Sequence, residues 1–162
     1  MLAQLGHMAI AMTQLSQARS LQAKIGQLVL LYPVTDTHTK TETYQTFRDG
    51  PYLAEKMMDW MIAAFLPRPD DRRTALASPL SFAPDEVLAK FPPTTIFISG
   101  ADPLIGEGEG FGHRLQALGV DTAILKANGQ INDFALLEPV RGSGTARAVV
   151  QLAALKLRQA FE

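Results

Sequence analysis

The stretch Thr94-Thr95-Ile96-Phe97-Ile98-Ser99-Gly100-Ala101-Asp102-Pro103 decides how this chain folds. Its first five residues are all β-branched or aromatic, which favours a strand packed among other strands. Gly100 and Pro103 then end the strand, because glycine lets the chain turn and proline cannot continue a ladder of hydrogen bonds. The stretch predicts a buried strand over 94–99 that delivers a carboxylate, Asp102, just beyond its end.

A helix follows that strand, and the alternation extends to both ends of the chain. Phe111, Leu115 and Leu118 are spaced four and three residues apart, as on one face of a helix. Gly119 is placed to act as its C-cap. The remaining expected elements are strands over 27–32 and 121–126 and helices over 7–20, 53–66 and 148–159.

This alternation of helices and strands predicts an α/β fold. We expect a single domain over 1–162, with about three parallel strands joined by right-handed crossovers and flanked by helices. The continuous apolar strand over 27–32 fits a sheet covered on both faces. The Thr- and Asp-rich segment 34–51 and the Gly-rich segment 127–146 have no helical period and are expected to be loops.

Composition excludes several classes of function. The 162 residues include no cysteine, and 15 basic against 16 acidic side chains give a net charge of −1. Disulfide scaffolds are therefore excluded, and there is no electrostatic reason to bind nucleic acid or an anionic membrane. No apolar run approaches the roughly 18–20 residues that span a bilayer, and no secretory signal is visible at the start. We expect a cytoplasmic protein.

Polar groups gather where the predicted strands end, which is where open parallel sheets place their sites. Asp102 follows one strand, the segment 128–134 follows another, and Gly6-His7 opens the first helix. A carboxylate one turn past a buried strand is well placed to orient a catalytic base. Asp102 could equally cap the turn before the next helix, so its residue type alone leaves both interpretations open.

Together these segments resemble the C-terminal half of an α/β-hydrolase of the hormone-sensitive-lipase-like esterase group. Asp102-Pro103-Leu104 followed by Glu107-Gly108 is similar to the Asp-Pro-Leu-x-x-Glu-Gly segment that supplies the acid of that group's catalytic triad. The resemblance implies ester hydrolysis through an acyl-serine, with Asp102 orienting the base. Further matches, in the same order as in the family, are Tyr32-Pro33, Ala77-Ser78-Pro79-Leu80 and Arg114-Leu115-Gln116-Ala117-Leu118-Gly119-Val120.

The base of the triad is replaced in this sequence. The family's loop reads Gly-x-x-His-x-Phe, whereas here Gly129-Gln130-Ile131-Asn132-Asp133-Phe134 places Asn132 at the histidine position. An amide has no proton affinity near neutral pH, so it cannot take a proton from a hydroxyl. Asn132 therefore marks a lost base.

The nucleophile is missing as well. The family's serine would fall on Ala3 and the glycine before it on Met1, and no Gly-x-Ser-x-Gly occurs in the chain. Ser143 lacks the outer glycines of such an elbow. The family's oxyanion-hole segment, His-Gly-Gly-Gly, has no counterpart here. Because losing serine or histidine alone lowers turnover on the order of a million-fold, we expect this chain to be catalytically impaired.

No other residues offer an obvious replacement. His7 falls at a packing position, His38 is expected to be exposed, and His113 is expected to face solvent or a neighbouring charge. The acidic residues around Asp102 have no histidine at a metal-binding spacing, so we expect no metal and no cofactor. The glycines within 106–112 match no phosphate-binding motif.

A non-enzymatic role is the alternative function: binding of a small ester, another apolar ligand or a partner subunit. The helix over 53–66 carries an apolar stripe expected in the core, and the resemblance makes contact with an acyl chain its second interpretation. This stripe consists of Met57, Met58, Trp60, Met61 and Phe65, and Leu53 and Ala64 follow the same helical period.

The resemblance also implies an incomplete sheet. The three strands correspond to the last three of the family's sheet, so the strand over 27–32 would expose the edge where the nucleophile strand normally pairs. Exposed apolar edges promote association, and we expect marginal stability or a homo-oligomer formed through this edge. A further possibility is that the sequence is truncated at its start.

Overall fold

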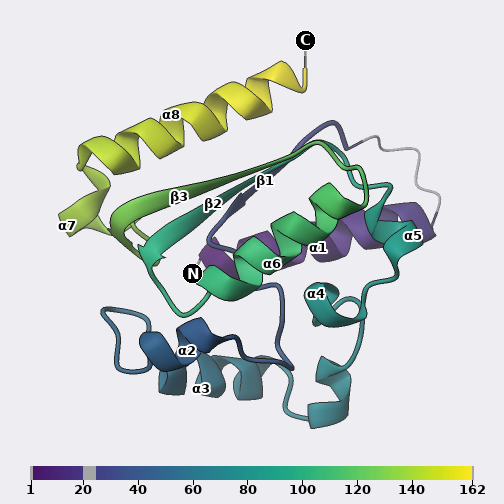
Figure 1. Ribbon diagram of the computed structural model, residues 1–162, viewed down its shortest axis with the longest axis horizontal. Helices are drawn as coiled ribbons and strands as arrows, with labels where there is room; N and C mark the ends of the chain where they lie inside the picture. The colour runs from purple at the N-terminus through teal and green to yellow at the C-terminus, as the bar shows by residue number, and fades with distance from the viewer. Residues whose placement is uncertain (1, 20–24, 162) are drawn as a thin grey trace.

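The computed structural model describes residues 2–19 and 25–161, and its centre is a three-stranded parallel sheet (Figure 1). The strands lie in the order β1-β2-β3, and β2 pairs with both neighbours in parallel. This confirms the predicted α/β class with three parallel strands. The strand bounds are β1 Leu28–Leu31, β2 Thr94–Ala101 and β3 Thr122–Ile131.

Helices precede, separate and follow the strands. The long helices fall where the sequence predicts them, although the end of the first prediction, Ser20, lies outside the described residues. No helix among the described residues is long and apolar enough to cross a membrane. The helices are α1 Leu2–Ala18, α2 Glu42–Thr46, α3 Glu55–Phe65, α4 Pro79–Phe82, α5 Asp85–Leu88, α6 Ile105–Ala117, α7 Glu138–Arg141 and α8 Gly144–Gln159, with a 3-10 turn over Pro69–Arg72.

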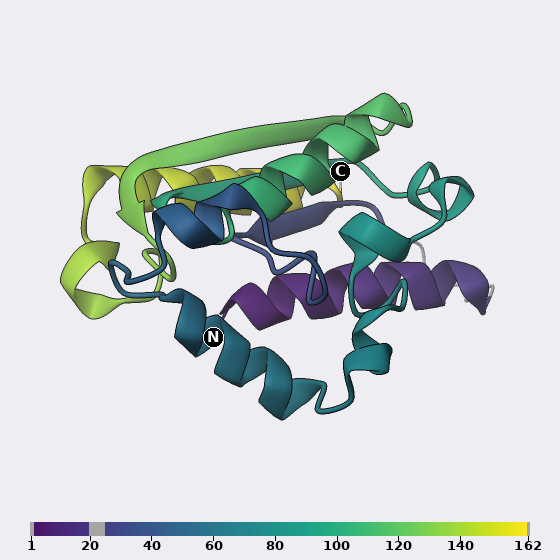
Figure 2. The same cartoon turned by 60° about the horizontal axis from the view of Figure 1, so that its bottom comes forward.

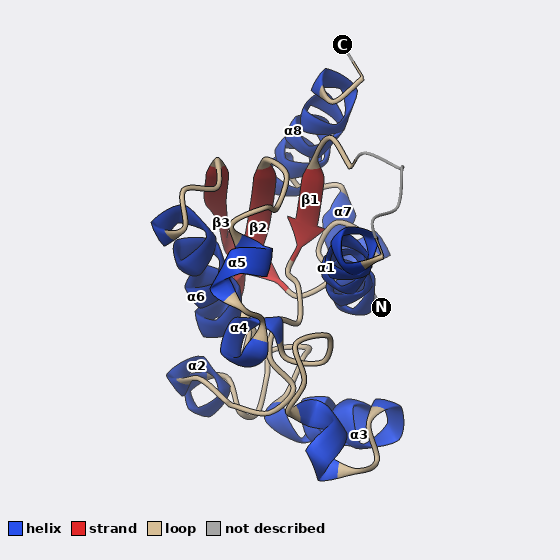
Figure 3. Ribbon diagram, turned by 90° about the vertical axis from the view of Figure 1, so that its right-hand side faces the viewer, coloured by secondary structure: helices blue, strands red, loops and turns tan. Residues whose placement is uncertain are grey.

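The sheet is covered on both faces, as its apolar strands predict (Figures 1 and 3). Helix α8 packs on one face, where Phe97 of β2 is buried. Helices α1 and α6 pack on the other face, which takes Ile96 and Ile98 of β2. Alternate residues of one strand thus enter two separate apolar clusters, and this buries β2 completely over 94–99.

The remaining segments gather beyond the carboxyl ends of the strands. Figure 3 shows α2 and α3 past the arrowheads of the sheet, and Figure 2 shows the start of α1 beside α3. The two segments predicted to be loops are partly structured. Helix α2 lies within 34–51, and β3 continues into 127–146 because Ile131 pairs with Ala101.

The apolar stripe predicted for the core of α3 is only partly buried. Leu53, just before the helix, and Met61 are buried, but Trp60 and Phe65 are 69% and 63% exposed. Met57 is exposed as well, whereas Met58 and Met61 are buried as predicted, together with Ile62, which the predicted stripe did not include. Since α3 lies beyond the strand ends rather than on a sheet face, it has a narrow contact and leaves much of its apolar surface outside.

Helix α1 also buries a face that apolar periodicity does not predict. Met8 and Met12 are more than half exposed, whereas His7 and Gln14 are buried. Both buried side chains bond the segment after α3: His7 Nε2 lies 2.8 Å from the Leu76 carbonyl, and Gln14 Nε2 donates to the Ala75 carbonyl at 3.0 Å. Polar side chains are therefore at the interface because they satisfy backbone carbonyls there.

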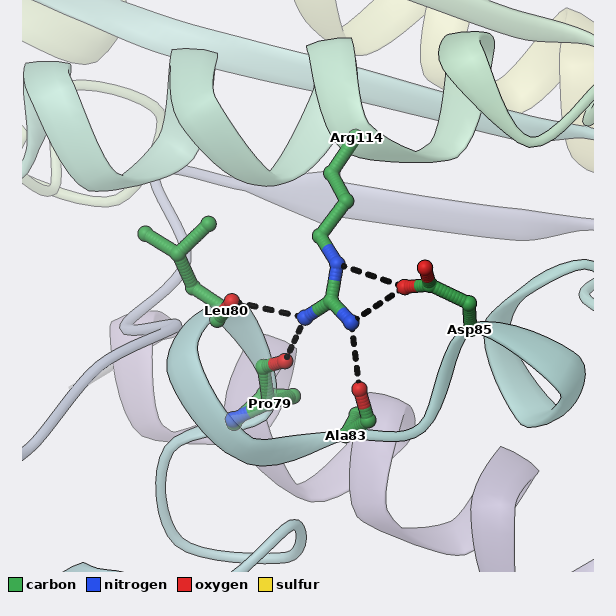
Figure 4. A network of polar contacts seen from close by, with 5 residues as sticks. All are labelled: Pro79, Leu80, Ala83, Asp85 and Arg114. Carbon is green, nitrogen blue, oxygen red and sulfur yellow. Dashed lines mark hydrogen bonds and ion pairs between the residues drawn. The ribbon is translucent and has the colours of Figure 1, made fainter.

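Arg114 of α6 holds the two short helices that precede β2 (Figure 4). Its guanidinium donates to the carbonyl oxygens of Pro79, Leu80 and Ala83 and also pairs with the carboxylate of Asp85. A planar group with several fixed donors can cap several carbonyls at once. One side chain thereby ties the ends of α4 and α5 to the central layer.

Close packing of α6 on the sheet depends on one of its glycines, which gives a first prediction. A Cβ on Gly112 would lie 2.6 and 2.7 Å from side-chain atoms of Ile124, whereas one on Gly110 would lie 3.6 Å from Leu80. We expect Gly112→Ala to lower the free energy of unfolding by about 1–3 kcal/mol through overpacking. Gly110→Ala, the matched control on the same helix, should raise it by about 0.5–1 kcal/mol. Urea unfolding measures both, and shifts of the same sign would contradict this packing.

Candidate functional site

Asp102 lies directly beyond the end of β2 and is 1% exposed. Its Oδ1 accepts a hydrogen bond from the Leu104 backbone N–H at 3.0 Å, and its Oδ2 accepts one from Asn132 Nδ2 at 2.7 Å. Burial raises the pKa of Asp102 to about 6, and these hydrogen bonds oppose the rise because they favour the charged form. Asp102 is thus a buried carboxyl group that caps the turn before α6 and also accepts a hydrogen bond from the Asn132 side chain.

Asn132 reaches Asp102 through an irregularity in the β2–β3 ladder. Ser99 pairs with Ala127, but the next pair is Ala101 with Ile131, so β3 gains two residues at this point. The strands approach closely there: a Cβ on Gly100 would lie 2.8 Å from the Gly129 nitrogen and 2.9 Å from the Ala127 oxygen. Only glycine fits this approach. The shift places Asn132, rather than Gln130, opposite Asp102.

The orientation of the Asn132 amide follows from its partner. A carboxylate accepts hydrogen bonds, so the Asn132 Nδ2 must face Asp102. The other end of the amide, Oδ1, is sealed from solvent and has no hydrogen-bond partner among the described residues. Position 132 therefore supplies a donor to Asp102 and an unused acceptor, and neither atom takes up a proton near neutral pH.

The backbone around this pair is strained. Three residues other than glycine have a positive φ in the described chain: Tyr32 at 38°, Tyr52 at 65° and Asp133 at 60°. Tyr32 follows β1 and packs against Phe134; burial raises the pKa of its phenol above the usual range, and the charges of Asp133 and Asp102 add to this rise. Left-handed backbone is costly for residues with a Cβ and concentrates at functional sites. Backbone strain is thus found at the same carboxyl-terminal edge of the sheet as Asp102.

The other residues singled out in the sequence lie apart from this pair. His38 and His113 are exposed, His7 is buried, and Ser143 caps α8 by accepting from the Ala146 N–H. The side chain at the serine position, Ala3, and the whole of Met1 lie outside what the structure describes. Within the described residues, no group of three acidic or histidine side chains is placed to hold a metal ion.

Glu107 has a buried role that the sequence interpretation missed. Glu107 lies in the first turn of α6 and is completely buried; it accepts hydrogen bonds from the Thr35 and Asp36 N–H groups, at 2.7 and 3.3 Å, and from the Tyr44 hydroxyl at 3.0 Å. Burial raises its pKa to about 8, and the donors oppose this. The available signal was its spacing, since Glu107 lies four residues before Phe111 on the same helical face.

An apolar cavity of about 350 Å³ opens beside this network, between the start of α1 and α3. The loop held by Glu107 contributes Val34 and Thr37 to its wall. Most of the remaining wall is aliphatic or aromatic, and its rim includes the exposed Met8, Phe65 and Leu76. The other lining residues are His7, Ala11, Leu53, Met58, Met61, Ile62, Leu66, Asp71, Thr74 and Ala77.

A parallel sheet with a buried acid past its central strand and an apolar cavity at its carboxyl edge is the arrangement of an α/β hydrolase. Residues 6–136 match the sequence profile of the alpha/beta hydrolase fold family. The chain belongs to this family, which confirms the resemblance to hormone-sensitive-lipase-like esterases.

Several esterases are similar to this chain. An esterase of Gibberella moniliformis is 58% identical over 156 residues, which are 96% of this chain and 49% of that protein. The crystal structure of carboxyl esterase 2 from Tuber melanosporum superposes with a TM-score of 0.92 at 35% identity, covering 96% of this chain and 50% of that one. The crystal structure of a thermostable esterase from Pseudomonas putida superposes with a TM-score of 0.88 at 31% identity, covering 94% of this chain and 48% of that one. The chain spans about half the length of these relatives.

A second prediction tests the Asp102–Asn132 contact. Asn132→Asp places two carboxyls in one buried hydrogen bond, so the folded protein keeps a proton that the unfolded chain releases above about pH 4. The stability of the variant should therefore be close to wild type at pH 5 and fall, relative to wild type, by up to about 1.4 kcal/mol per pH unit toward pH 8. Urea unfolding at three pH values measures this difference.

The exposed Asn128 provides the matched control for this substitution. Asn128→Asp makes the same change in charge on the same strand and should leave the pH dependence of stability unchanged. A stability difference between Asn132→Asp and wild type that stays constant from pH 5 to pH 8 would contradict the buried contact.

Proposed function

We propose that this chain, on its own, does not hydrolyse esters efficiently and keeps the ester-binding half of an esterase site. The observation that carries the proposal is the 2.7 Å hydrogen bond from Asn132 Nδ2 to Asp102. This hydrogen bond pairs the Asp102 carboxyl group with a side chain that cannot act as a base. The absence of Gly-x-Ser-x-Gly from the sequence supports the same conclusion for the nucleophile.

The kind of ligand is inferred from the cavity and from the relatives. The cavity of about 350 Å³ is lined largely by apolar side chains and lies at the strand ends, where such sheets bind ligands. One relative, 29% identical over 125 residues, is named ethyl acetate hydrolase. A small carboxylic ester, or the apolar portion of one, is therefore the ligand class that we propose for this chain.

Hydrolysis of 4-nitrophenyl butyrate tests the catalytic part of the proposal. We expect no saturable rate above the buffer background, and no change with Asp102→Asn. Asn132→His should also remain inactive, because it restores the residue type of a base without a nucleophile. Saturable hydrolysis that Asp102→Asn abolishes would show that a working nucleophile and base are present after all.

Self-association is a second candidate property, favoured by the surface around β1. Among the described strands, β1 pairs only with β2, so its other edge is open, and α1 beside it exposes Leu5, Met8 and Met12. An open strand edge next to apolar surface favours association.

Light scattering coupled to size exclusion should therefore detect a dimer that dissociates on dilution. Met8→Lys together with Met12→Lys should weaken dimerisation by at least about tenfold, since both charges would have to be desolvated at the contact. Lys56→Glu, a change of charge on the exposed side of α3, is the control. A monomer at all concentrations would rule out this association.

A further inference from the structure

The cavity between α1 and α3 contains one polar side chain that differs from the others. Thr37 donates to the Ala77 carbonyl, Thr74 donates to the Asp71 carbonyl, and the Asp71 carboxylate pairs with Arg68. These groups are therefore already engaged within the protein. His7 is the remaining polar residue of the wall, and only one of its two ring nitrogens has a hydrogen-bond partner among the residues that the structure describes.

The hydrogen bond of His7 defines its tautomer. The Leu76 carbonyl can only accept, so Nε2 carries the proton of this 2.8 Å contact. Burial lowers the pKa of His7, although the carbonyls of Leu76 and Ala77 act in the opposite direction. In the neutral ring Nδ1 then has a lone pair, and no hydrogen bond to it is found among the described residues.

The imidazole ring of His7 is also held in place at the cavity wall. The imidazole packs edge-on against Phe65, with ring centroids 6.1 Å apart, and both rings line the cavity. An otherwise apolar cavity thus has a fixed hydrogen-bond acceptor in its wall.

We propose that this cavity prefers apolar molecules that carry one O–H donor, such as aromatic or aliphatic alcohols, and that His7 Nδ1 accepts the hydrogen bond. This inference rests on the proposed ligand-binding function and specifies its chemistry: the alcohol portion of an ester, once free, matches the cavity better than a hydrocarbon of the same shape. A single acceptor in an apolar wall provides such selectivity because it loses its partner when the hydroxyl is absent.

Benzyl alcohol and ethylbenzene form a matched pair of probes, since they differ by a hydroxyl in place of a methyl group. Their dissociation constants can be measured by NMR titration of the full chain and of His7→Phe. We expect His7→Phe to weaken the binding of benzyl alcohol roughly three- to tenfold, which is the range of one neutral hydrogen bond. The affinity for ethylbenzene should change less than about twofold. Retained ethylbenzene binding also shows that the variant keeps its cavity.

The wild-type protein gives an independent measurement that does not need the variant to fold. The ¹⁵N resonance of His7 Nδ1 should shift on addition of benzyl alcohol and stay in place with ethylbenzene. Affinity for benzyl alcohol should also fall as the pH is lowered through the titration of His7, because a protonated Nδ1 cannot accept. Asp71, the other titratable residue of the cavity wall, is already paired with Arg68.

The outcomes separate this inference from the proposed function. The role of His7 would be overturned if His7→Phe weakened the binding of both probes equally. It would also be overturned if the Nδ1 resonance of the wild type did not move when benzyl alcohol was bound. The cavity would then be an apolar site only. Failure of both probes to bind wild type would overturn the proposed ligand-binding function, and the inference with it. Selective weakening of benzyl alcohol binding in His7→Phe supports both the proposed ligand-binding function and the role of His7.

Discussion

The two-residue shift in the β2–β3 ladder is the constraint on which the site depends. A regular ladder would place Gln130 beside Asp102, whereas the shift brings Asn132 there. The shift requires a backbone approach at Gly100 that leaves no room for a side chain. Because the displacement is an even number of residues, the strand keeps the same side chains on each face of the sheet. The irregularity therefore re-aims the end of β3 without disturbing the core below it.

Burial of carboxyl groups links this strand end to the cavity. Asp102 and Glu107 are both sealed in the first turns after β2, and each is tolerated only because donors surround it. The donors to Glu107 come from the loop after β1, and the same loop lines the cavity through Val34 and Thr37. The acid and the apolar wall are thus positioned by one continuous set of hydrogen bonds.

Local sequence patterns were sufficient to locate the strands and the polar residues that follow them. Apolar runs bounded by glycine and proline located the strands, and parallel topology then brings Asp102 and Asn132 to one edge. Side-chain exposure at the periphery was less predictable. Trp60 and Phe65 have the spacing of a buried stripe, but α3 has no sheet face to cover and leaves them exposed. The spacing of Glu107 from Phe111 indicates its buried face, but the donors that make its burial possible lie more than sixty residues away, and no local pattern reveals them.

The fold and the chemistry make different demands on position 132. A buried Asp102 requires a donor at this position, since without one its carboxylate would lose a hydrogen bond in a site that water does not reach. On the function proposed for this chain, ester hydrolysis would require, in addition, that the same side chain take up a proton from a nucleophile. Histidine meets both demands, whereas asparagine meets only the first. Asn132 can therefore preserve the geometry of an esterase site while, on the function proposed here, withholding its catalysis. Similarity of fold to active esterases is expected in either case.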